Sequence, residues 1–295
     1  MKQQRLNPSW KAGFLFALPA LLFTLLFEYY PIGNGIYHAF YRWNGADIEK
    51  FVGLDNFAEI IRDDVFWISV KNMFIFLAAS IVLMLPTFVA CIVLFRLKSA
   101  RLQYMYRVVF CVQMIIPGMV VLLIWKFMYN PQFGFFNKAL DYLGLHQYQQ
   151  LWLGDSSLAL WCLIFMGFPW ISTIGALIYM GGLQSIDGSI WDASQIDGVG
   201  PIRKAFSLEL PLLKGQIKLN LITVIVGSIT GYGTQLIMTN GGPGFSTTTP
   251  GLYMYQKAFG TSAEYGYASA VGLILFVIAL LISLGAMKFI RSEEA

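Results

Sequence analysis

Charged side chains are scarce in this sequence of 295 residues: Asp, Glu, Lys and Arg make up 12% of it, whereas about 25% is usual for a soluble domain. Apolar residues take their place and reach 57%. A surface with so little charge and so much apolar area is unsuited to water, so the composition predicts a bilayer as the solvent. The net charge of +4 is too small to indicate a nucleic-acid partner.

Cysteine and histidine are also rare. Cys91, Cys111 and Cys162 lie inside apolar runs without paired spacing, and His38 and His146 are isolated. The sequence contains no Ser/His/Asp grouping and no GxxxxGK[ST] phosphate loop. We therefore expect no metal, no cofactor and no catalytic residue in this chain, and we expect that it is not an enzyme.

Six stretches nearly or wholly free of charge are long enough to cross about 30 Å of hydrocarbon as helices. They cover residues 12–37, 73–95, 108–125, 156–183, 219–238 and 265–287. The first follows basic residues as a signal peptide does, but no small-residue cleavage pattern comes after it, so we expect it to remain as a span. The predicted fold is all-α, a polytopic membrane bundle of six transmembrane helices.

The loops differ in charge, and this difference predicts the orientation. The N-terminal tail carries Lys2, Arg5 and Lys11, and residues 96–107 carry four basic side chains, with no acid in either segment. Basic loops stay in the cytoplasm, whereas the connection after the first span carries six acids against three bases. We expect both termini to be cytoplasmic, in a multi-pass membrane protein.

The predicted organisation has four parts. They are a cytoplasmic tail 1–11, a first helix with its external loop 12–68, a transmembrane core 69–290 that contains a cytoplasmic loop 184–215, and a cytoplasmic tail 291–295.

The cytoplasmic loop is patterned. Residues 190–196 can form a short amphipathic helix, Asp197 and Gly198 mark a turn, and a second helical stretch leads to Pro211. Such a helix–turn–helix can serve as a docking knob or can be a solvated loop. Acidic and small side chains favour docking, because they accept bonds from a basic partner and permit close approach. The candidate docking residues are Asp192, Ala193, Ser194, Asp197, Gly198 and Pro211.

This loop resembles the EAA signature, E-A-A-x-x-D-G-A followed by L-P, of permease subunits of ATP-binding-cassette importers. Residues 192–194 occupy the E-A-A positions, 197–199 the D-G-A positions and 210–211 the L-P positions. Other stretches are similar to the sugar-permease branch, of the maltose and glycerol-phosphate type. They are FVGLDNF at 51–57, WKFMYNPQFGFFN at 125–137, GLQSI at 182–186, GGPG at 241–244 and YGYAS at 265–269.

The resemblance implies a working assembly in a prokaryotic cell membrane. It would contain a second, homologous permease, two copies of a cytoplasmic ATPase that uses ATP and Mg, and an external solute-binding protein. The loop would insert into the ATPase and couple ATP hydrolysis to alternating access. The implied solute is a monosaccharide, an oligosaccharide or a related polyol or glycerol phosphate.

Polar side chains at bilayer depth are candidates for the pathway of a hydroxyl-rich solute. Ser228, Tyr232 and Gln235 follow an i, i+4, i+7 spacing that predicts one helical face. Trp170, Ser172 and Thr173 follow Pro169. The alternative is that these groups form hydrogen bonds between helices.

Two other functions fit a polytopic membrane protein. A membrane-embedded enzyme would need ionisable groups that converge at depth, and spans two to six have almost none. A self-sufficient secondary transporter usually shows internal repeats and acids in the membrane, and neither is present. An associated ATPase is expected of the importer alone.

Overall fold

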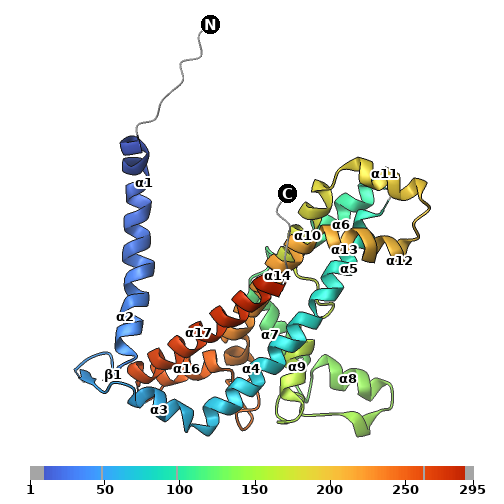
Figure 1. Ribbon diagram of the computed structural model, residues 1–295. Helices are drawn as coiled ribbons and strands as arrows, with labels where there is room; N and C mark the ends of the chain where they lie inside the picture. The colour runs from blue at the N-terminus through green and yellow to red at the C-terminus, as the bar shows by residue number, and fades with distance from the viewer. Residues whose placement is uncertain (1–9, 48, 98, 262, 290–295) are drawn as a thin grey trace. The chain divides into compact units, whose positions relative to one another are not determined.

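The computed structural model describes residues 10–47, 49–97, 99–261 and 263–289. The chain forms two compact units, Met1–Arg62 with Met254–Ile274 and Asp63–Tyr253 with Leu275–Ala295. The described residues are mostly helical, as expected (Figure 1). The predicted tails 1–11 and 291–295 fall almost wholly outside these residues.

The first unit contains a small departure from the all-α prediction. Strands β1 (Tyr41–Trp43) and β2 (Glu49–Phe51) pair antiparallel. Aromatic residues favour strands, and the rings of the opposed Tyr41 and Phe51 lie 5.2 Å apart. The buried Asn56 donates hydrogen bonds to the carbonyls of Ala39 and Tyr41, at 2.8 and 2.9 Å, and so fixes the hairpin.

Helices of the first unit precede and follow this hairpin in the sequence. They are α1 (Trp10–Thr24), the π-helical η1 (Leu25–Tyr29), α2 (Tyr30–His38) and α3 (Asp55–Ile61). Helices α16 (Pro250–Phe259) and α17 (Tyr265–Phe289) each continue from one unit into the other.

The second unit contains the remaining helices. In chain order they are α4 (Asp64–Val82), α5 (Met84–Phe95), α6 (Ala100–Val112), α7 (Gly118–Met128), α8 (Phe135–Tyr142), η2 (His146–Tyr148), α9 (Ala159–Phe165), α10 (Thr173–Ser185), α11 (Gly188–Ile196), α12 (Pro201–Lys204), η3 (Ala205–Glu209), α13 (Leu210–Leu212), α14 (Lys214–Thr230) and α15 (Gly233–Met238).

Three helical segments among the described residues are long and apolar enough to cross a membrane: Ala12–His38, Asp64–Phe95 and Tyr265–Lys288. A fourth candidate is the pair Pro201–Leu212 and Lys214–Thr230, which is bent by 73°. The other apolar stretches, 108–125, 156–183 and 219–238, are each divided between two shorter helices.

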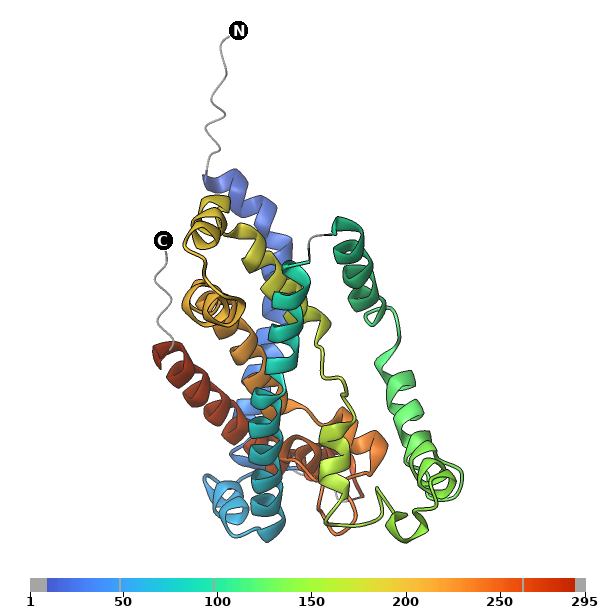
Figure 2. The ribbon, with the colours of Figure 1, turned by 90° about the vertical axis from the view of Figure 1, so that its right-hand side faces the viewer.

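The helix breaks have local causes. Figure 2 shows the irregular stretch between α6 and α7 in green. Pro117 in this stretch lacks the N–H that a continuing helix needs. Residues 166–172 separate α9 from α10, and Ser172 begins the new helix by accepting a hydrogen bond from Gly175 N at 3.1 Å. Gly231 ends α14 with an extended ψ of 135°. Irregular backbone at membrane depth occurs where it is buried or lines a cavity, so these breaks indicate a polar interior.

A loop between α15 and α16 is held to α4 by one buried amide. Asn72 donates to the carbonyls of Phe245 and Thr248 at 3.0 and 2.9 Å. The loop contains four residues of positive φ, at Asn240, Gly241, Gly244 and Phe245. Left-handed backbone is uncommon at the non-glycine residues Asn240 and Phe245 and persists only where surrounding contacts support it. The amide of Asn72 provides such a contact at Phe245 O.

We expect Asn72→Ala to destabilise the protein by about 2 kcal/mol, because two buried carbonyl groups lose their donor. The measurement is the thermal unfolding midpoint of the purified protein in mild detergent, with the exposed Gln132→Ala as the control. An unchanged midpoint for Asn72→Ala would show that the loop keeps its conformation without the amide.

Candidate functional site

Two adjoining cavities lie in the second unit, where the helix breaks occur. Their volumes are about 340 and 760 Å³. Both are lined by residues of α4, of the segment between α9 and α10, and of α14. The shared lining residues are Ser80, Leu83, Gly167, Trp170 and Val224. Among the described residues, no Asp, Glu, Lys, Arg or His lines either cavity, so this wall is polar only through hydroxyl, amide, indole and backbone groups.

The structure brings five of the six predicted pathway residues to these cavities. Trp170 lines both, Ser172 lines the smaller one, and Ser228, Tyr232 and Gln235 line the larger one. The sixth residue does not line them.

Thr173 is that sixth residue. Its hydroxyl donates to Phe110 O at 2.9 Å and lies 3.4 Å from Gln113 Oε1. It therefore makes the helix–helix contact that was the alternative explanation for this group.

The proposed helical face on the fifth span requires correction. Tyr232 precedes α15 with a φ of −144°, outside helical geometry, so Ser228 and Gln235 belong to different helices. The chain turns at residues 231–232 and still directs all three residues into one cavity.

Trp170 has an unusual backbone, with a φ of 57°. A bulky residue with positive φ is strained, and such residues concentrate at functional sites. The indole is fixed by a hydrogen bond from Nε1 to Ile164 O at 3.3 Å and by edge contacts with Phe165 and Phe168. A Cβ on Gly167 would lie 3.2 Å from Trp170 Cδ1, so glycine keeps room for the ring.

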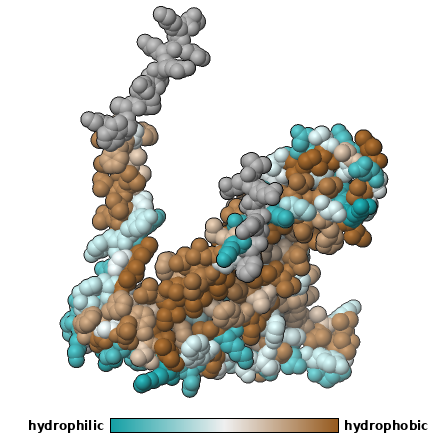
Figure 3. Space-filling view, viewed as in Figure 1, coloured by the Kyte–Doolittle hydropathy of each residue, from teal (hydrophilic) through white to brown (hydrophobic). Residues whose placement is uncertain are grey.

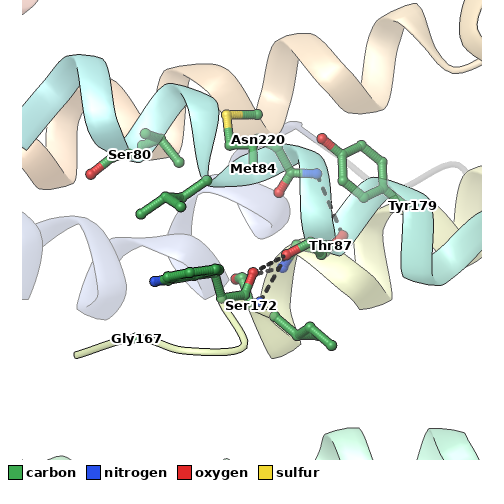
Figure 4. A pocket seen from close by; sticks show the side chains of 12 residues that line it. Ser80, Met84, Thr87, Gly167, Ser172, Tyr179 and Asn220 are labelled. Carbon is green, nitrogen blue, oxygen red and sulfur yellow. Dashed lines mark hydrogen bonds between the residues drawn. The ribbon is translucent and has the colours of Figure 1, made fainter. Parts of the chain in front are cut away.

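Thr87 is a site residue that the sequence analysis missed. Its hydroxyl donates to Trp170 O at 3.1 Å and accepts from Ser172 N at 2.9 Å, so it joins α5 to the broken segment (Figure 4). Thr87 lines the smaller cavity, and Tyr179 and Asn220 line it from α10 and α14. Buried polar residues inside apolar stretches were the available signal, since Thr87 and Asn220 lie within predicted spans.

Gln235 is 7% exposed, and its Oε1 is buried without a hydrogen-bond partner in the part of the chain that the structure describes. An unsatisfied buried acceptor costs about 1–3 kcal/mol, and a protein keeps one where a ligand or water completes it. The Gln235 amide is thus suited to accept a hydroxyl hydrogen.

The predicted cytoplasmic loop is a helix–turn–helix. Helix α11 begins after Asp187, whose carboxylate accepts from Ser189 N at 2.7 Å. The hydroxyl and the amide of Ser189 lower the pKa of Asp187, so this contact stabilises the cap above the ordinary carboxyl pKa and is lost as the pH falls through the lowered value. Gly198 ends the helix with a φ of 61°, and Val199 N donates to Ser194 O at 3.1 Å.

Not all predicted docking residues face outward. Asp192, Ala193, Asp197 and Gly198 are exposed. Ser194 is 4% exposed and donates its hydroxyl to Trp191 O at 2.7 Å, so its side chain packs inside the loop. Pro211 is half-buried in α13 and belongs to the connection to α14.

The loop also exposes large apolar side chains that the sequence analysis did not single out. Ile196 is 86% exposed, Ile202 74% and Phe206 68%. Figure 3 shows apolar patches among hydrophilic ones over α11 and α12. An exposed apolar patch bordered by polar residues is typical of a protein-binding surface.

The comparisons with known proteins agree with this architecture. Residues 69–291 match the family model described as "Binding-protein-dependent transport system inner membrane component". The chain is 32% identical over 285 residues to "Probable ABC transporter permease protein YurN" of Bacillus subtilis, which covers 95% of this chain and 96% of that one. It is 30% identical to "Multiple sugar-binding transport system permease protein MsmF" of Streptococcus mutans, over 98% of both chains.

The fold is found in a solved structure, "Crystal structure of a bacterial ABC transporter involved in the import of the acidic polysaccharide alginate". The two chains are 19% identical, the similarity covers 97% of this chain and 98% of that one, and the TM-score is 0.82. This likeness shows a shared fold. The resemblance inferred from the EAA-like loop is confirmed by the family match, and the chain belongs to the inner-membrane components of binding-protein-dependent transport systems, the ABC transporter permeases.

Proposed function

We propose that this chain is one permease subunit of an ATP-driven importer and that it forms part of the path of an uncharged, hydroxyl-rich solute. The observation that carries the proposal is the meeting of three interrupted helices around two cavities that no Asp, Glu, Lys, Arg or His of the described residues lines. Aromatic rings can stack on the apolar face of a sugar, while Gln235 and Ser228 can bond its hydroxyls.

The chemistry of the cavity favours a neutral carbohydrate among the expected solutes. A phosphate or carboxylate group is usually held by Arg or Lys, and this wall offers neither. The relatives include proteins named for multiple sugars and for trehalose and maltose. We infer a monosaccharide, an oligosaccharide or a polyol, and we rank glycerol phosphate below them.

The loop 184–215 is proposed as the contact with a separate ATPase. Its arm Pro201–Leu212 bends by 73° from Lys214–Thr230, so the arm is suited to lie along the membrane surface while α14 enters the membrane. The contact surface then combines Asp192, Asp197 and Gly198 with the exposed Ile196, Ile202 and Phe206. Closure of an ATPase dimer would press on this surface and switch the cavity between inward-open and outward-open states.

We further propose the assembly and topology that the family resemblance implies. The membrane core crosses the bilayer six times, with the broken helices counted as single spans and both termini in the cytoplasm. It pairs with a second homologous permease and two ATPase copies in a prokaryotic cell membrane. An external solute-binding protein delivers the solute, and one solved neighbour carries a periplasmic protein bound to an alginate pentasaccharide.

Purification in mild detergent from the native cell tests this function. The expected result is a complex with a second permease and an ATPase, whose ATP hydrolysis rises when one sugar and its binding protein are added. Reconstituted vesicles should take up that sugar when ATP is present on the ATPase side. A chain that purifies alone and moves solute down an ion gradient would instead show a self-sufficient secondary transporter.

A further inference from the structure

A buried ion pair connects the cytoplasmic loop to α5. Arg96 Nε donates to Glu209 Oε1 at 3.0 Å, and Arg96 Nη2 donates to Glu209 Oε2 at 2.7 Å. The same Nη2 donates to Pro201 O at 2.9 Å. Glu209 is fully buried, whereas the side chain of Arg96 is 27% exposed. One guanidinium therefore holds both ends of the segment that runs from α12 to η3.

Burying this ion pair costs more free energy of desolvation than burying apolar residues of similar volume. Removing two charges from water costs several kcal/mol per ion, and apolar residues of similar volume often stabilise a protein equally well. What the bidentate pair adds is geometry, because the planar guanidinium donates two parallel hydrogen bonds to a carboxylate in one orientation. Arg96 is the C-terminal cap of α5, so the pair fixes the position of the loop relative to that helix.

Other contacts make the loop and the inner ends of the helices one packed body. The rings of Phe95 and Trp191 lie 5.3 Å apart, and Lys204 Nζ lies 4.7 Å from the centre of the Trp191 ring. A Cβ on Gly182 would lie within 2.7 Å of the side chains of Gln216 and Leu213, so α10 and the start of α14 are in close contact. These contacts join the loop to the ends of α5, α10 and α14.

Helix α5 carries the connection onward to the cavity. Thr87 lies nine residues before Arg96 on this continuous helix, a distance of roughly 14 Å at the rise of an α-helix. Its hydroxyl bonds both Trp170 O and Ser172 N at the break between α9 and α10. Loop, ion pair, α5 and cavity wall thus form a continuous series of packed contacts.

We propose that Arg96 and Glu209 are positioning residues that make the cytoplasmic loop and α5 move together, so that a displacement of the loop reaches Trp170 through Thr87. The inference rests on the proposed function, because it assumes an ATPase that displaces the loop. On this proposal, the Arg96–Glu209 pair determines how efficiently ATP hydrolysis is converted into transport.

The test uses the whole complex with its ATPase and binding protein, reconstituted in vesicles. Arg96→Gln and Glu209→Gln remove one partner each, and Arg96→Glu combined with Glu209→Arg exchanges them. Arg101 is exposed and lies in the same basic segment 96–107 as Arg96, so Arg101→Gln is the matched control. The readout is the number of solute molecules transported per ATP hydrolysed, which a loss of folded protein alone does not change.

The single variants are expected to lower this ratio between about threefold and thirtyfold, as residues that couple two sites do. Arg101→Gln should leave the ratio unchanged, and the exchanged pair should recover part of it. An unchanged ratio in assembled Glu209→Gln or Arg96→Gln complexes would overturn the proposal.

If Arg96→Gln and Glu209→Gln do not assemble with the ATPase, Arg96→Lys tests the proposal instead. Lysine keeps the positive charge beside Glu209 but cannot make the bidentate contact of the guanidinium. The complex is therefore expected to assemble, with the number of solute molecules transported per ATP lowered by at least about twofold. A normal ratio in this variant would equally overturn the proposal. A wild-type chain that recruits no ATPase would refute the proposed function itself, which is a different result from wild-type coupling that the variants leave unchanged.

Discussion

Gly198→Pro is expected to lower solute uptake per assembled complex by at least about tenfold, which corresponds to about 1.4 kcal/mol of lost coupling. Gly198 has a φ of 61° and donates its N–H to Gln195 O at 3.1 Å. Proline fixes φ near −65° and has no N–H, so the turn after α11 must rearrange. The bundle should remain folded, because open space surrounds Gly198. Uptake into vesicles and retention of the ATPase on purification are the measurements.

Alanine at two neighbouring glycines provides a matched control. A Cβ on Gly198 or on Gly200 meets nothing within 4 Å, but Gly200 has a φ of −64° that any residue adopts. Gly198→Ala should therefore reduce uptake to a degree between the wild type and Gly198→Pro, while Gly200→Ala should leave it unchanged. Equal uptake in all three variants would remove Gly198 from the coupling surface.

Gln235→Met is expected to change stability and transport in opposite directions. The substitution nearly conserves volume and removes a buried amide oxygen that no described residue satisfies, so the protein should gain about 1 kcal/mol of stability. Uptake should fall by at least about tenfold, because the solute hydroxyl that Gln235 bonds would be left without its partner. Thermal unfolding without solute and uptake with solute give the two quantities.

The control for Gln235→Met is Thr223→Ala on α14. Among the residues that the structure describes, the hydroxyl of Thr223 bonds only Leu219 O of its own helix, and Thr223 lines neither cavity. Its removal should leave uptake unchanged. If Gln235→Met lost stability and transported normally, the amide would be a structural group with a partner outside the described residues, and its assignment to the solute path would be withdrawn.

Features set by local physical chemistry were predictable from the sequence. A stretch such as 73–95 is apolar over the width of a bilayer, and it lies within the helical segment Asp64–Phe95. Helix α11 begins two residues before the predicted 190–196 and ends at the predicted residue, because Gly198 supplies the left-handed turn. These features depend on neighbours in the chain, so their signals are present in the sequence.

Features that depend on distant partners were not predictable. Nothing near Thr173 in the sequence shows that Phe110 O, 63 residues away, accepts its hydroxyl. The spacing of 228, 232 and 235 indicated a helix that the chain in fact interrupts. The pairing of Arg96 with Glu209 joins positions 113 residues apart. Such contacts arise from packing between helices, which a single sequence does not encode by periodicity.

The interrupted helices also constrain how the chain enters a membrane. Helix α7 has 11 residues and α10 has 13, so they extend for about 17 and 20 Å, less than the roughly 30 Å of hydrocarbon. Alone in lipid, each segment would leave backbone groups without hydrogen bonds, which is costly. These segments are therefore poor candidates for independent insertion, and the long helix Asp64–Phe95, which precedes them in synthesis, is placed to receive them.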